Sequence, residues 1–430
     1  MKLKLAYGRE GLWVDLPDDM AITVVEPRPV AGLPDEQAAL KDALRSPMGT
    51  PALSQMVEPA DRVAIVFSDL TRPMPNDRVL PALLEELAQA GVPDEAITLI
   101  NALGTHRPQT DTELERMLGP AIAGRYRIVQ HDAWDEDNLV EAGRNRSGRR
   151  VRVHRAYMEA SFRVLTGFIE PHLFAGYSGG PKAVLPGIAD IEAILDNHGP
   201  QMIADPRATW AVLDGNPIWE EILSVALTTE PDFLLNVTLN QHREITGVFA
   251  GDVVEAHRAG AAFVGQSALQ PVPEAYDVVL TSNSGYPLDL NLYQGVKGMS
   301  AAARIVEPGG DIILAAECWD GIPDHGEYKR LLWEADSPQA LLDRVMAPGF
   351  RCHDQWEAQL QAQIQIKARV HVYADGLSEG ALRQAMVIPS ASVEETLAQI
   401  RREKPGATMA VLPDGPQTVP YVGERGSRGS

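Results

Sequence analysis

The stretch Arg62–Leu103 decides the fold class, and it reads RVAIVFSDLTRPMPNDRVLPALLEELAQAGVPDEAITLINAL. It begins with the continuous apolar run of a buried strand, which a short polar loop follows. An amphipathic helix then ends at Gly91, and a second apolar strand begins at Ala96. Because polar side chains follow each strand directly, this order of elements predicts an open parallel α/β sheet that binds its ligand at the carboxyl ends of the strands.

The alternation of strands and helices resumes in a second series at residues 277–413. Between the two series, residues 266–277 contain two prolines among polar residues, and they are the best candidate for a linker. Residues 1–30 alternate between apolar and polar and predict short strands in a small antiparallel piece. Residues 190–225 are expected to be mainly helical.

The chain of 430 residues is long enough for two hydrophobic cores. The expected fold class is α/β, with two α/β domains of mostly parallel sheets and the active site in the cleft between them. The expected parts are an N-terminal cofactor-binding and catalytic domain at 1–270, a C-terminal α/β domain that closes the substrate cleft at 271–422, and a tail or cloning remnant at 423–430.

Composition and charge narrow the class of protein. The 38 Lys and Arg residues against 59 Asp and Glu residues leave a net charge of −21, which argues against a nucleic-acid binder and against docking on anionic lipid. Two cysteines, Cys318 and Cys352, with no CxxC motif fit a protein of the reducing cytoplasm. No signal peptide is visible, and no apolar run approaches the roughly 20 residues that span a bilayer. We therefore expect a cytoplasmic protein with no membrane or nucleic-acid partner.

Two polar loops that follow strands carry candidate functional side chains. SDLTRP, Ser68–Pro73, offers Arg72, whose guanidinium can bind a carboxylate or phosphate with two hydrogen bonds. In the alternative interpretation this is a structural loop in which Asp69 pairs with Arg72. GTHR, at 104–107, offers His106 as an acid/base group for neutral pH, although a histidine in a loop can also be structural.

The stretch Leu165–Ala189, LTGFIEPHLFAGYSGGPKAVLPGIA, combines three kinds of functional group. Its glycines allow a close approach of the backbone, so that Ser178–Gly180 can hold a phosphate. Lys182 is a candidate nucleophile or phosphate cation, and His172 a candidate acid/base group. The motif is not a Walker P-loop, because Pro181 interrupts its Gly–Lys pair. The structural alternatives are a solvated lysine and a packed core imidazole.

Two further motifs follow along the chain. DNHGP, at 196–200, contains His198, a candidate metal ligand that has no second ligand nearby in the sequence. LYQGVKGM contains Tyr293, Gln294 and Lys297 near the start of a helix, where residues four apart share a face. That face can present a phenol and an amine to an anion, or it can be an ordinary helix surface.

These five motifs, SDLTRP, GTHR, EPHLFAGYSGGPKAVLPGIA, DNHGP and LYQGVKGM, occur in an order that resembles the nickel-pincer lactate racemase family of 2-hydroxyacid racemases and epimerases. The resemblance covers nearly the whole chain. It implies a nickel-pincer nucleotide, which is a pyridinium-3-thioamide-5-thiocarboxylic acid mononucleotide with Ni(II), covalently linked to Lys182. The cofactor would give nickel three donors and His198 the fourth, and soft donors in a square plane suit Ni(II).

The resemblance also implies a role for each remaining motif residue. His106 and His172 match the two acid/base histidines of the family. The implied cofactor-binding residues are Asp69, Thr71, Ser178, Gly179, Gly180 and Trp356 in addition to Lys182, and the implied substrate-binding residues are Arg72, Tyr293, Gln294 and Lys297. The implied reaction inverts the α-carbon by proton-coupled hydride transfer through a planar 2-keto acid, with one histidine serving each enantiomer.

Two alternatives from other classes remain open. One is a zinc-type metallohydrolase that uses His106, His172 and His198, and the other is a catalytically inactive homologue that binds a sugar acid or a nucleotide. For the favoured reading the expected partner is a small 2-hydroxyacid such as lactate, malate or an aldonate epimerised at its second carbon. Transient contact with cofactor-synthesis enzymes is also implied. The motifs do not choose among the substrates, because the carboxylate-binding residues are common to all of them.

Overall fold

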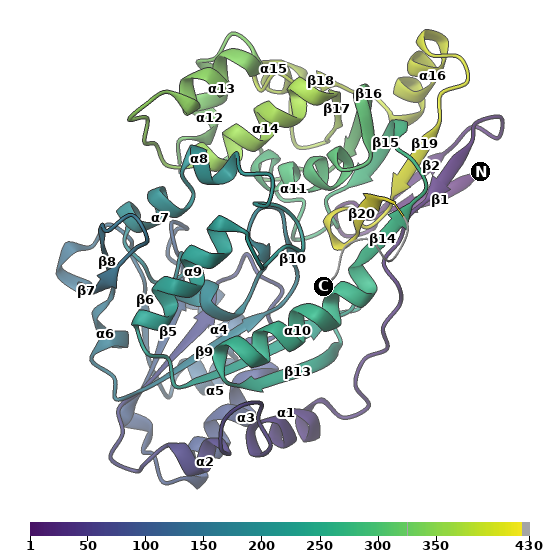
Figure 1. The fold of residues 1–430 in the computed structure, drawn as a ribbon. Coiled ribbons are helices and arrows are strands. Elements are labelled where there is room, and N and C mark those ends of the chain that lie inside the picture. The colour runs from purple at the N-terminus through teal and green to yellow at the C-terminus, as the bar shows by residue number, and fades with distance from the viewer. Residues whose placement is uncertain (325, 424–430) are drawn as a thin grey trace. The chain divides into compact units, whose positions relative to one another are not determined.

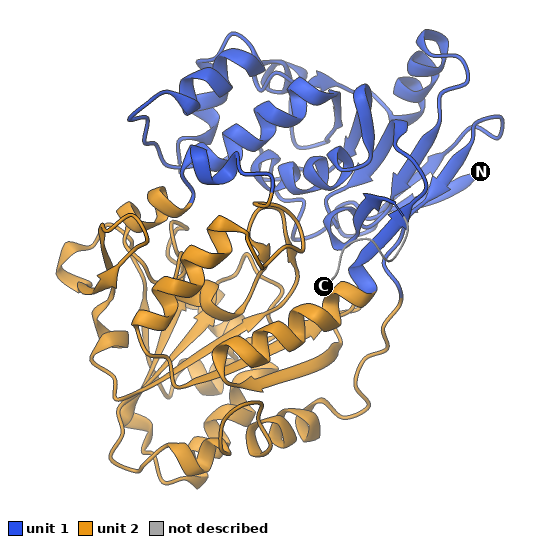
Figure 2. Cartoon of the chain, in the orientation of Figure 1, with its two compact units in different colours: residues 1–28, 198–206, 267–430 blue, residues 29–197, 207–266 orange. Residues whose placement is uncertain are grey.

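The computed structural model describes residues 1–324 and 326–423, and it divides into two compact units (Figures 1 and 2). Unit 1 contains residues 1–28, 198–206 and the chain from 267 onward. Unit 2 contains residues 29–197 and 207–266. The predicted tail lies outside the described residues except for residue 423. Within the described ranges no helix is long and apolar enough to cross a membrane.

Unit 2 is built on a six-stranded sheet with the strand order β13-β12-β9-β4-β5-β6, in which only the β12–β13 pair is antiparallel. The strands of unit 2 are β4 (Val63–Ser68), β5 (Ile97–Ala102), β6 (Arg127–Gln130), β7 (Leu139–Arg144), β8 (Arg150–His154), β9 (Phe162–Phe168), β10 (Pro171–His172), β11 (Gly176–Tyr177), β12 (Phe233–Leu239) and β13 (Ile245–Gly251). Its helices are α1 (Glu36–Arg45), α2 (Leu53–Met56), α3 (Asn76–Gln89), α4 (Asp111–Leu118), α5 (Pro120–Ala123), α6 (Arg155–Met158), α7 (Ile191–Asn197), α9 (Pro217–Thr228) and α10 (Val253–Ala268), with the 3-10 turn η3 (Gly180–Ala183). The predicted parallel sheet is therefore present.

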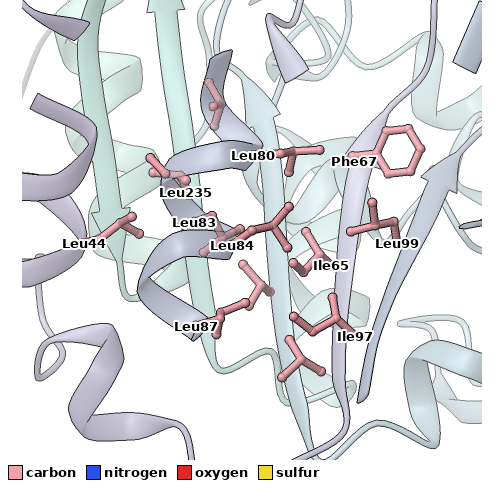
Figure 3. Packing of buried hydrophobic residues seen from close by; sticks show 14 of the residues in the cluster. Leu44, Ile65, Phe67, Leu80, Leu83, Leu84, Leu87, Ile97, Leu99 and Leu235 are labelled. Carbon is pink, nitrogen blue, oxygen red and sulfur yellow. The ribbon is translucent and has the colours of Figure 1, made fainter. Parts of the chain in front are cut away.

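The core of unit 2 explains why the opening stretch folds as it does. Strand β4 is buried on both faces, as its continuous apolar run requires in a parallel sheet. Helix α3 buries Leu80, Leu83 and Leu87 against the sheet, and their spacing of three and four residues places them on one face. Figure 3 shows these leucines among side chains from β4, β5, β12 and α1. Each fully buried leucine contributes about 1.5–3 kcal/mol.

Unit 1 has its own six-stranded sheet, which is parallel throughout and has the order β18-β17-β16-β15-β19-β3. Its strands are β1 (Lys2–Leu5), β2 (Leu12–Asp15), β3 (Ile22–Val24), β14 (Leu269–Val272), β15 (Tyr276–Ser282), β16 (Val306–Ala315), β17 (Arg369–Tyr373), β18 (Ile388–Pro389), β19 (Met409–Leu412) and β20 (Val419–Val422). Its helices are α8 (Pro200–Ile203), α11 (Leu292–Ala303), α12 (Tyr328–Trp333), α13 (Pro338–Met346), α14 (Gln355–Lys367), α15 (Glu379–Gln384) and α16 (Val393–Glu403).

The units differ from the domains expected at 1–270 and 271–422, because two segments cross over. Strands β1 and β2 form the expected antiparallel piece, but β3 pairs in parallel with β19, near the C-terminus. The first 28 residues therefore belong to unit 1. Residues 198–206 also belong to unit 1, where the Pro200 carbonyl on α8 accepts a hydrogen bond from Gln359 of α14.

The structure refines two local expectations. The chain passes from unit 2 to unit 1 between Gln266 and Ser267, at the start of the predicted linker, but the stretch 266–277 also contains strand β14, which pairs with β20. The stretch 190–225 contains the expected helices as α7, α8 and the start of α9, but it is interrupted between Ile203 and Pro217. The Asn216 side chain caps α9 by accepting hydrogen bonds from the backbone N–H groups of Ile218 and Trp219.

A cluster of charged side chains lies in the unit 1 sheet at the point where the pairing of β16 with β17 begins. Asp311 is fully buried, and its carboxylate contacts His371 Nε2 at 2.9 Å and Arg369 Nε at 2.7 Å. The amine of Lys404 donates to the same carboxylate at 2.9 Å. Burial alone would raise the pKa of Asp311, but the three hydrogen bonds outweigh burial and hold that pKa well below its usual range.

Replacing Asp311 with asparagine should destabilise the protein by about 2–3 kcal/mol at neutral pH. This is less than for a fully enclosed ion pair, because Arg369 and Lys404 are partly exposed to solvent. A carboxyl with a depressed folded-state pKa contributes stability above its unfolded pKa of about 3.9, and loses it as pH falls through the lower folded value. The stability gap between wild type and variant, measured by urea unfolding, should be constant from pH 5 to 8 and narrow below pH 4. A gap that widens with acid would contradict this assignment.

Candidate active site

The predicted polar loops follow three neighbouring strands of unit 2, at the carboxyl ends of those strands. Strands β9, β4 and β5 are adjacent and parallel, so their carboxyl ends lie side by side. The loop with Asp69 follows β4, the loop with His106 follows β5, and the segment with His172 and Lys182 follows β9. The predicted site residues that unit 2 contains are Asp69, Thr71, Arg72, His106, His172, Ser178, Gly179, Gly180 and Lys182.

Asp69 and His106 form a hydrogen-bonded pair. The His106 Nδ1 atom lies 2.7 Å from Oδ2 of Asp69, whose side chain is only 3% exposed. The hydroxyl of Thr71 donates to both carboxylate oxygens, at 2.9 and 3.1 Å. Burial would raise the pKa of Asp69, but the charge and hydrogen bond of His106, together with Arg72 and Thr71, lower it. Asp69 is therefore an ionised acceptor at neutral pH.

Arg72 lies near a second carboxylate. Its Nη1 atom is 4.0 Å from Oε1 of Glu170, and both side chains are about one-quarter exposed. The sequence left open that the side chains of Asp69 and Arg72 pair with each other. In the structure the Asp69 side chain pairs with His106, and the Arg72 side chain lies near Glu170. A guanidinium held at this loose distance retains N–H donors for an incoming carboxylate.

His172, Phe174 and Lys182 lie together. The His172 ring is 7% exposed, and its centroid is 4.6 Å from that of Phe174 in an edge-on arrangement. The Nδ1 atom of His172 accepts the backbone N–H groups of Phe174 and Ala175 at 3.4 and 3.3 Å. The amine of Lys182, which is 9% exposed as a residue, lies 5.8 Å from the centre of the Phe174 ring. Phe174 thus contacts both candidate functional groups, and the sequence offered no signal that distinguished it from a core phenylalanine.

The glycine loop is held by internal hydrogen bonds. The N–H of Ser178 donates to the Glu170 carbonyl at 2.9 Å, and the Ser178 hydroxyl donates to the Phe168 carbonyl at 2.8 Å. The N–H of Gly180 donates to Oδ1 of Asn236 at 2.7 Å. Two of the three amides that sequence reasoning assigned to a phosphate are therefore already bonded within the protein. The loop's evident local role is to fix the turn that presents Lys182.

Gly180 shows why this turn requires glycine. Its φ is +54°, and a Cβ atom there would lie 2.4 Å from Cδ2 of His257. His257 in α10 stacks on Trp219 with ring centroids 4.6 Å apart and donates from Nε2 to the Ser178 carbonyl at 2.9 Å. Sequence reasoning missed Asn236 and His257. An asparagine inside the apolar strand FLLNVTLN was a usable signal, because a buried amide needs partners.

Replacing His257 with phenylalanine should loosen the glycine loop while keeping a ring on Trp219. The lost hydrogen bond to Ser178 should cost about 1–2 kcal/mol at pH 7.5. Burial lowers the pKa of His257 from 6.5 to about 4, and the Ser178 hydrogen bond offsets this only in part. The wild type therefore loses up to about 3 kcal/mol as pH falls from 6.5 to 4, because the unfolded chain binds the proton first.

The phenylalanine variant lacks this loss, so its stability deficit should shrink as the solution is acidified. Thermal unfolding of both proteins between pH 4.5 and 7.5 measures the effect. The matched control is His242→Phe at an exposed position, which should not change the pH dependence. A deficit that grows with acid would mean that His257 is charged in the folded protein.

Unit 1 holds the other predicted site residues, which are Tyr293, Gln294, Lys297, Trp356 and His198. The first three lie in α11, which begins at Leu292 because the Asn291 side chain accepts the N–H of Gln294 at 3.1 Å. Tyr293 and Lys297 are four residues apart and share a helix face, as expected. Both are partly buried.

Trp356 connects the residues of unit 1. Its Nε1 donates to the Tyr293 hydroxyl at 2.9 Å, and its ring packs edge-on against that of His198 at 5.0 Å. His198 is 4% exposed, and its carbonyl accepts from the Gln355 side chain at 3.5 Å. The ring of His353 lies 5.7 Å from that of Trp356, and sequence reasoning did not name it. Unit 1 therefore brings Tyr293, Trp356 and His198 into one cluster.

His198 and Lys182 are the two predicted site residues that bear on a bound metal and on a covalently linked group. In residues 1–324 and 326–423, no group of three or more His, Cys, Asp or Glu side chains is arranged to hold a metal ion. A single imidazole such as His198 is a complete protein contribution when the other donors belong to an organic group. Lys182, at the end of a turn in which a Cβ on Gly180 would clash, is a buried amine suited to a covalent tether.

Comparison with known proteins shows which chains this one is similar to. Residues 7–211 match the lactate racemase N-terminal domain, and residues 272–419 match the lactate racemase C-terminal domain. The lactate racemase of Thermoanaerobacterium thermosaccharolyticum is 35% identical over 97% of this chain and 98% of its own length. That of Lactiplantibacillus plantarum is 35% identical over 88% of this chain and 90% of its own.

Solved structures show the same fold. The apoprotein of the lactate racemase from T. thermosaccharolyticum superimposes with a TM-score of 0.91 at 33% identity, over 99% of this chain and 100% of that chain. A protein from Thermotoga maritima superimposes with a TM-score of 0.71 at 17% identity, over 92% of this chain and 100% of that chain. The second likeness concerns the fold alone.

Proposed function

The chain belongs to the lactate racemase family, and from this premise we propose that it inverts the α-carbon of a lactate-type 2-hydroxyacid by proton-coupled hydride transfer. Membership makes it a racemase, which is an isomerase. The observation that best supports the mechanism is the meeting of an Asp69-bound imidazole, a buried imidazole and a buried amine at one edge of the unit 2 sheet.

The family is nickel-dependent, and we assign a nickel-pincer nucleotide to this chain. Lys182 would form the covalent link, His198 would bind nickel, and Trp356 would pack near the group. When bound, the group supplies a carrier for the α-hydrogen as hydride and soft donors for the metal. The family resemblance assigns five further residues to the cofactor: Asp69, Thr71, Ser178, Gly179 and Gly180. Hydrogen bonds within the protein already engage several of them, so we propose that they act by fixing the shape of the loops around the cofactor.

The chain's own groups handle protons and orientation. His106, with Nδ1 bonded to Asp69, has Nε2 available to accept the hydroxyl proton of one enantiomer. His172 serves the opposite enantiomer, since a planar 2-keto acid that turns over presents its oxygen to the opposite side. Arg72 and Lys297 hold the carboxylate during this turn, while Tyr293 and Gln294 line the substrate site.

The substrate class is a 2-hydroxyacid with an ionised carboxylate. Lactate is the reference substrate, because it is the one named for both curated relatives. Malate and aldonates present the same carboxylate and hydroxyl and differ only in the rest of the molecule. Arg72 and Lys297 would bind the carboxylate that these acids share, so they do not discriminate among them.

A deuterium experiment tests the proposal. The protein is co-produced with cofactor-synthesis enzymes and incubated in D₂O with single enantiomers of lactate, malate and gluconate. We expect inversion of at least one acid, with the α-hydrogen largely retained in the product. Rapid exchange of the α-hydrogen with solvent would overturn the hydride route, and the absence of inversion in protein that carries the Lys182 adduct would overturn the function.

A further inference from the structure

We propose that Asp69 is the positioning residue of His106, which it fixes in the tautomer that bears a proton on Nδ1, so that Nε2 is the atom that exchanges a proton with the substrate. This inference rests on the proposed function for the role of His106. It goes beyond that function by giving Asp69 a role on His106 and by distinguishing the hydrogen-bond partners of the two histidines.

The geometry of the pair carries the tautomer assignment. An ionised carboxylate only accepts hydrogen bonds, so at 2.7 Å from Asp69 Oδ2 the His106 Nδ1 atom must bear the proton. The neutral ring then has its lone pair on Nε2, which is the atom left to meet a substrate hydroxyl. Asp69 is 3% exposed, so its charge acts on the ring with little screening by water.

Asp69 is itself held in place. The Thr71 hydroxyl donates to both of its oxygens, and the N–H of Arg72 donates to its backbone carbonyl at 3.1 Å. These contacts close the loop after β4 and aim the carboxylate at the loop after β5. Both carboxylate oxygens therefore accept hydrogen bonds within the protein.

The charged groups around His106 come from three segments. The loop after β4 contributes Asp69 and Arg72, and the segment after β9 contributes Glu170, which is 4.0 Å from Arg72. On its own loop, Arg107 binds Glu113 at 2.7 Å, which nearly neutralises both. Arg72 acts electrostatically on both Glu170 and Asp69, and Asp69 is the charged group in direct contact with the ring.

His172 is built differently. Its Nδ1 accepts two backbone N–H groups, from Phe174 and Ala175, so an added proton on that nitrogen would face two donors. A carboxylate on Nδ1 favours the imidazolium, whereas amide donors on Nδ1 oppose it. The two histidines therefore differ in the partner of Nδ1, which is a carboxylate for His106 and backbone N–H groups for His172.

The proton balance of inversion turns this difference into a measurable quantity. In each turnover one histidine accepts the hydroxyl proton and the other returns a proton to the keto oxygen, so the pair carries one proton when substrate binds, two while the keto acid is present, and one again when product forms. Both directions use the same singly protonated form, and racemisation has an equilibrium constant of one. The pH profiles of kcat/KM must therefore coincide for the two enantiomers, as a single bell.

The decisive variant is Asp69→Asn, which keeps the shape of the side chain and removes its charge. We expect the alkaline limb of the bell to move to lower pH by about one unit or more, because a negative charge in contact with the ring is lost. The profiles of the two enantiomers should move together. The matched control is Asp311→Asn, another buried carboxylate that contacts a histidine, and it should leave both limbs in place.

A rate loss in Asp69→Asn with unmoved limbs would overturn the proposal, since a structural role alone lowers the rate without moving them. A second measurement needs no cofactor and no activity. Histidine labelled with ¹⁵N in the apoprotein should give a downfield Nδ1–H signal for His106, assigned by its disappearance in His106→Gln, and Asp69→Asn should weaken it. A neutral ring protonated on Nε2 would overturn the tautomer assignment.

The two readouts separate this inference from the proposed function. If the loaded wild type inverts no 2-hydroxyacid, the proposed function fails, and the ¹⁵N spectrum alone decides whether Asp69 fixes the ring. If the wild type inverts its substrate, the position of the alkaline limb decides. Unfolding curves recorded beside each assay show that the variant is folded under the conditions used.

Discussion

Replacing Lys182 with alanine is expected to abolish inversion entirely and to leave the protein without a covalent cofactor. Lys182 is the buried amine at the end of the glycine turn, and its position depends on hydrogen bonds that Asn236 and His257 make to that turn. Without the amine no covalent tether forms, so no residue can compensate. Lys182→Arg should be equally inactive, because a guanidinium keeps the charge but is a poor nucleophile at neutral pH.

Intact-mass measurement and inversion assays after co-production with cofactor-synthesis enzymes check this expectation. The wild type should carry the adduct, and both Lys182 variants should have the mass of the bare chain. Lys367→Ala is the matched control, because Lys367 is also partly buried and donates to a backbone carbonyl, of Ala303, at 2.6 Å. An adduct of wild-type mass on Lys182→Ala would place the tether on another residue.

Replacing His106 or His172 with alanine is expected to lower kcat/KM by about 100- to 10,000-fold, which corresponds to about 3–5 kcal/mol of transition-state stabilisation. Each turnover in either direction needs both rings, one as base and the other as acid. The double variant should therefore be only slightly slower than the slower single variant, because residues that act as a unit have non-additive effects. Each variant should also affect both enantiomers equally.

Initial rates with each enantiomer, measured on loaded protein with its adduct content determined by mass, test this expectation. The control is His371→Asn, which changes a buried histidine that contacts Asp311 in the unit 1 sheet and should leave kcat/KM near that of the wild type. Strictly additive losses in the double variant would mean that the two histidines act in separate steps on separate protons. In that case the assignment of the two rings as one acid/base pair would be wrong.

The fold class could be predicted because the features that define it are local. Buried parallel strands are continuous apolar runs, as in β4, and the helix that covers them repeats its leucines every three or four residues, as in α3. The sheet edge of the site was predictable as well, since parallel strands place their carboxyl ends together. The order of five short motifs then indicated the family, which the comparisons confirm.

The composition of the units was not predictable, because it depends on pairing across the whole chain. Strand β3 begins at residue 22 and pairs with β19 at Met409, and nothing in either segment specifies that partner. The same limit applies to Asn236 and His257, which brace the glycine loop from strand β12 and helix α10. A side chain that acts on a distant backbone atom has no signature in its own neighbourhood.

By itself, the sequence determined the chemical inventory of this protein: a parallel α/β scaffold, two candidate acid/base imidazoles, a candidate tether and one candidate metal ligand. The tertiary structure decided which hydrogen-bond partners these groups have. It joined Asp69 to His106 across two strands, gave the amides of the glycine loop to internal partners, and surrounded Nδ1 of His172 with backbone donors. Residue identity fixes which reactions are available, whereas the direction and protonation of each group depend on hydrogen bonds between segments far apart in the chain.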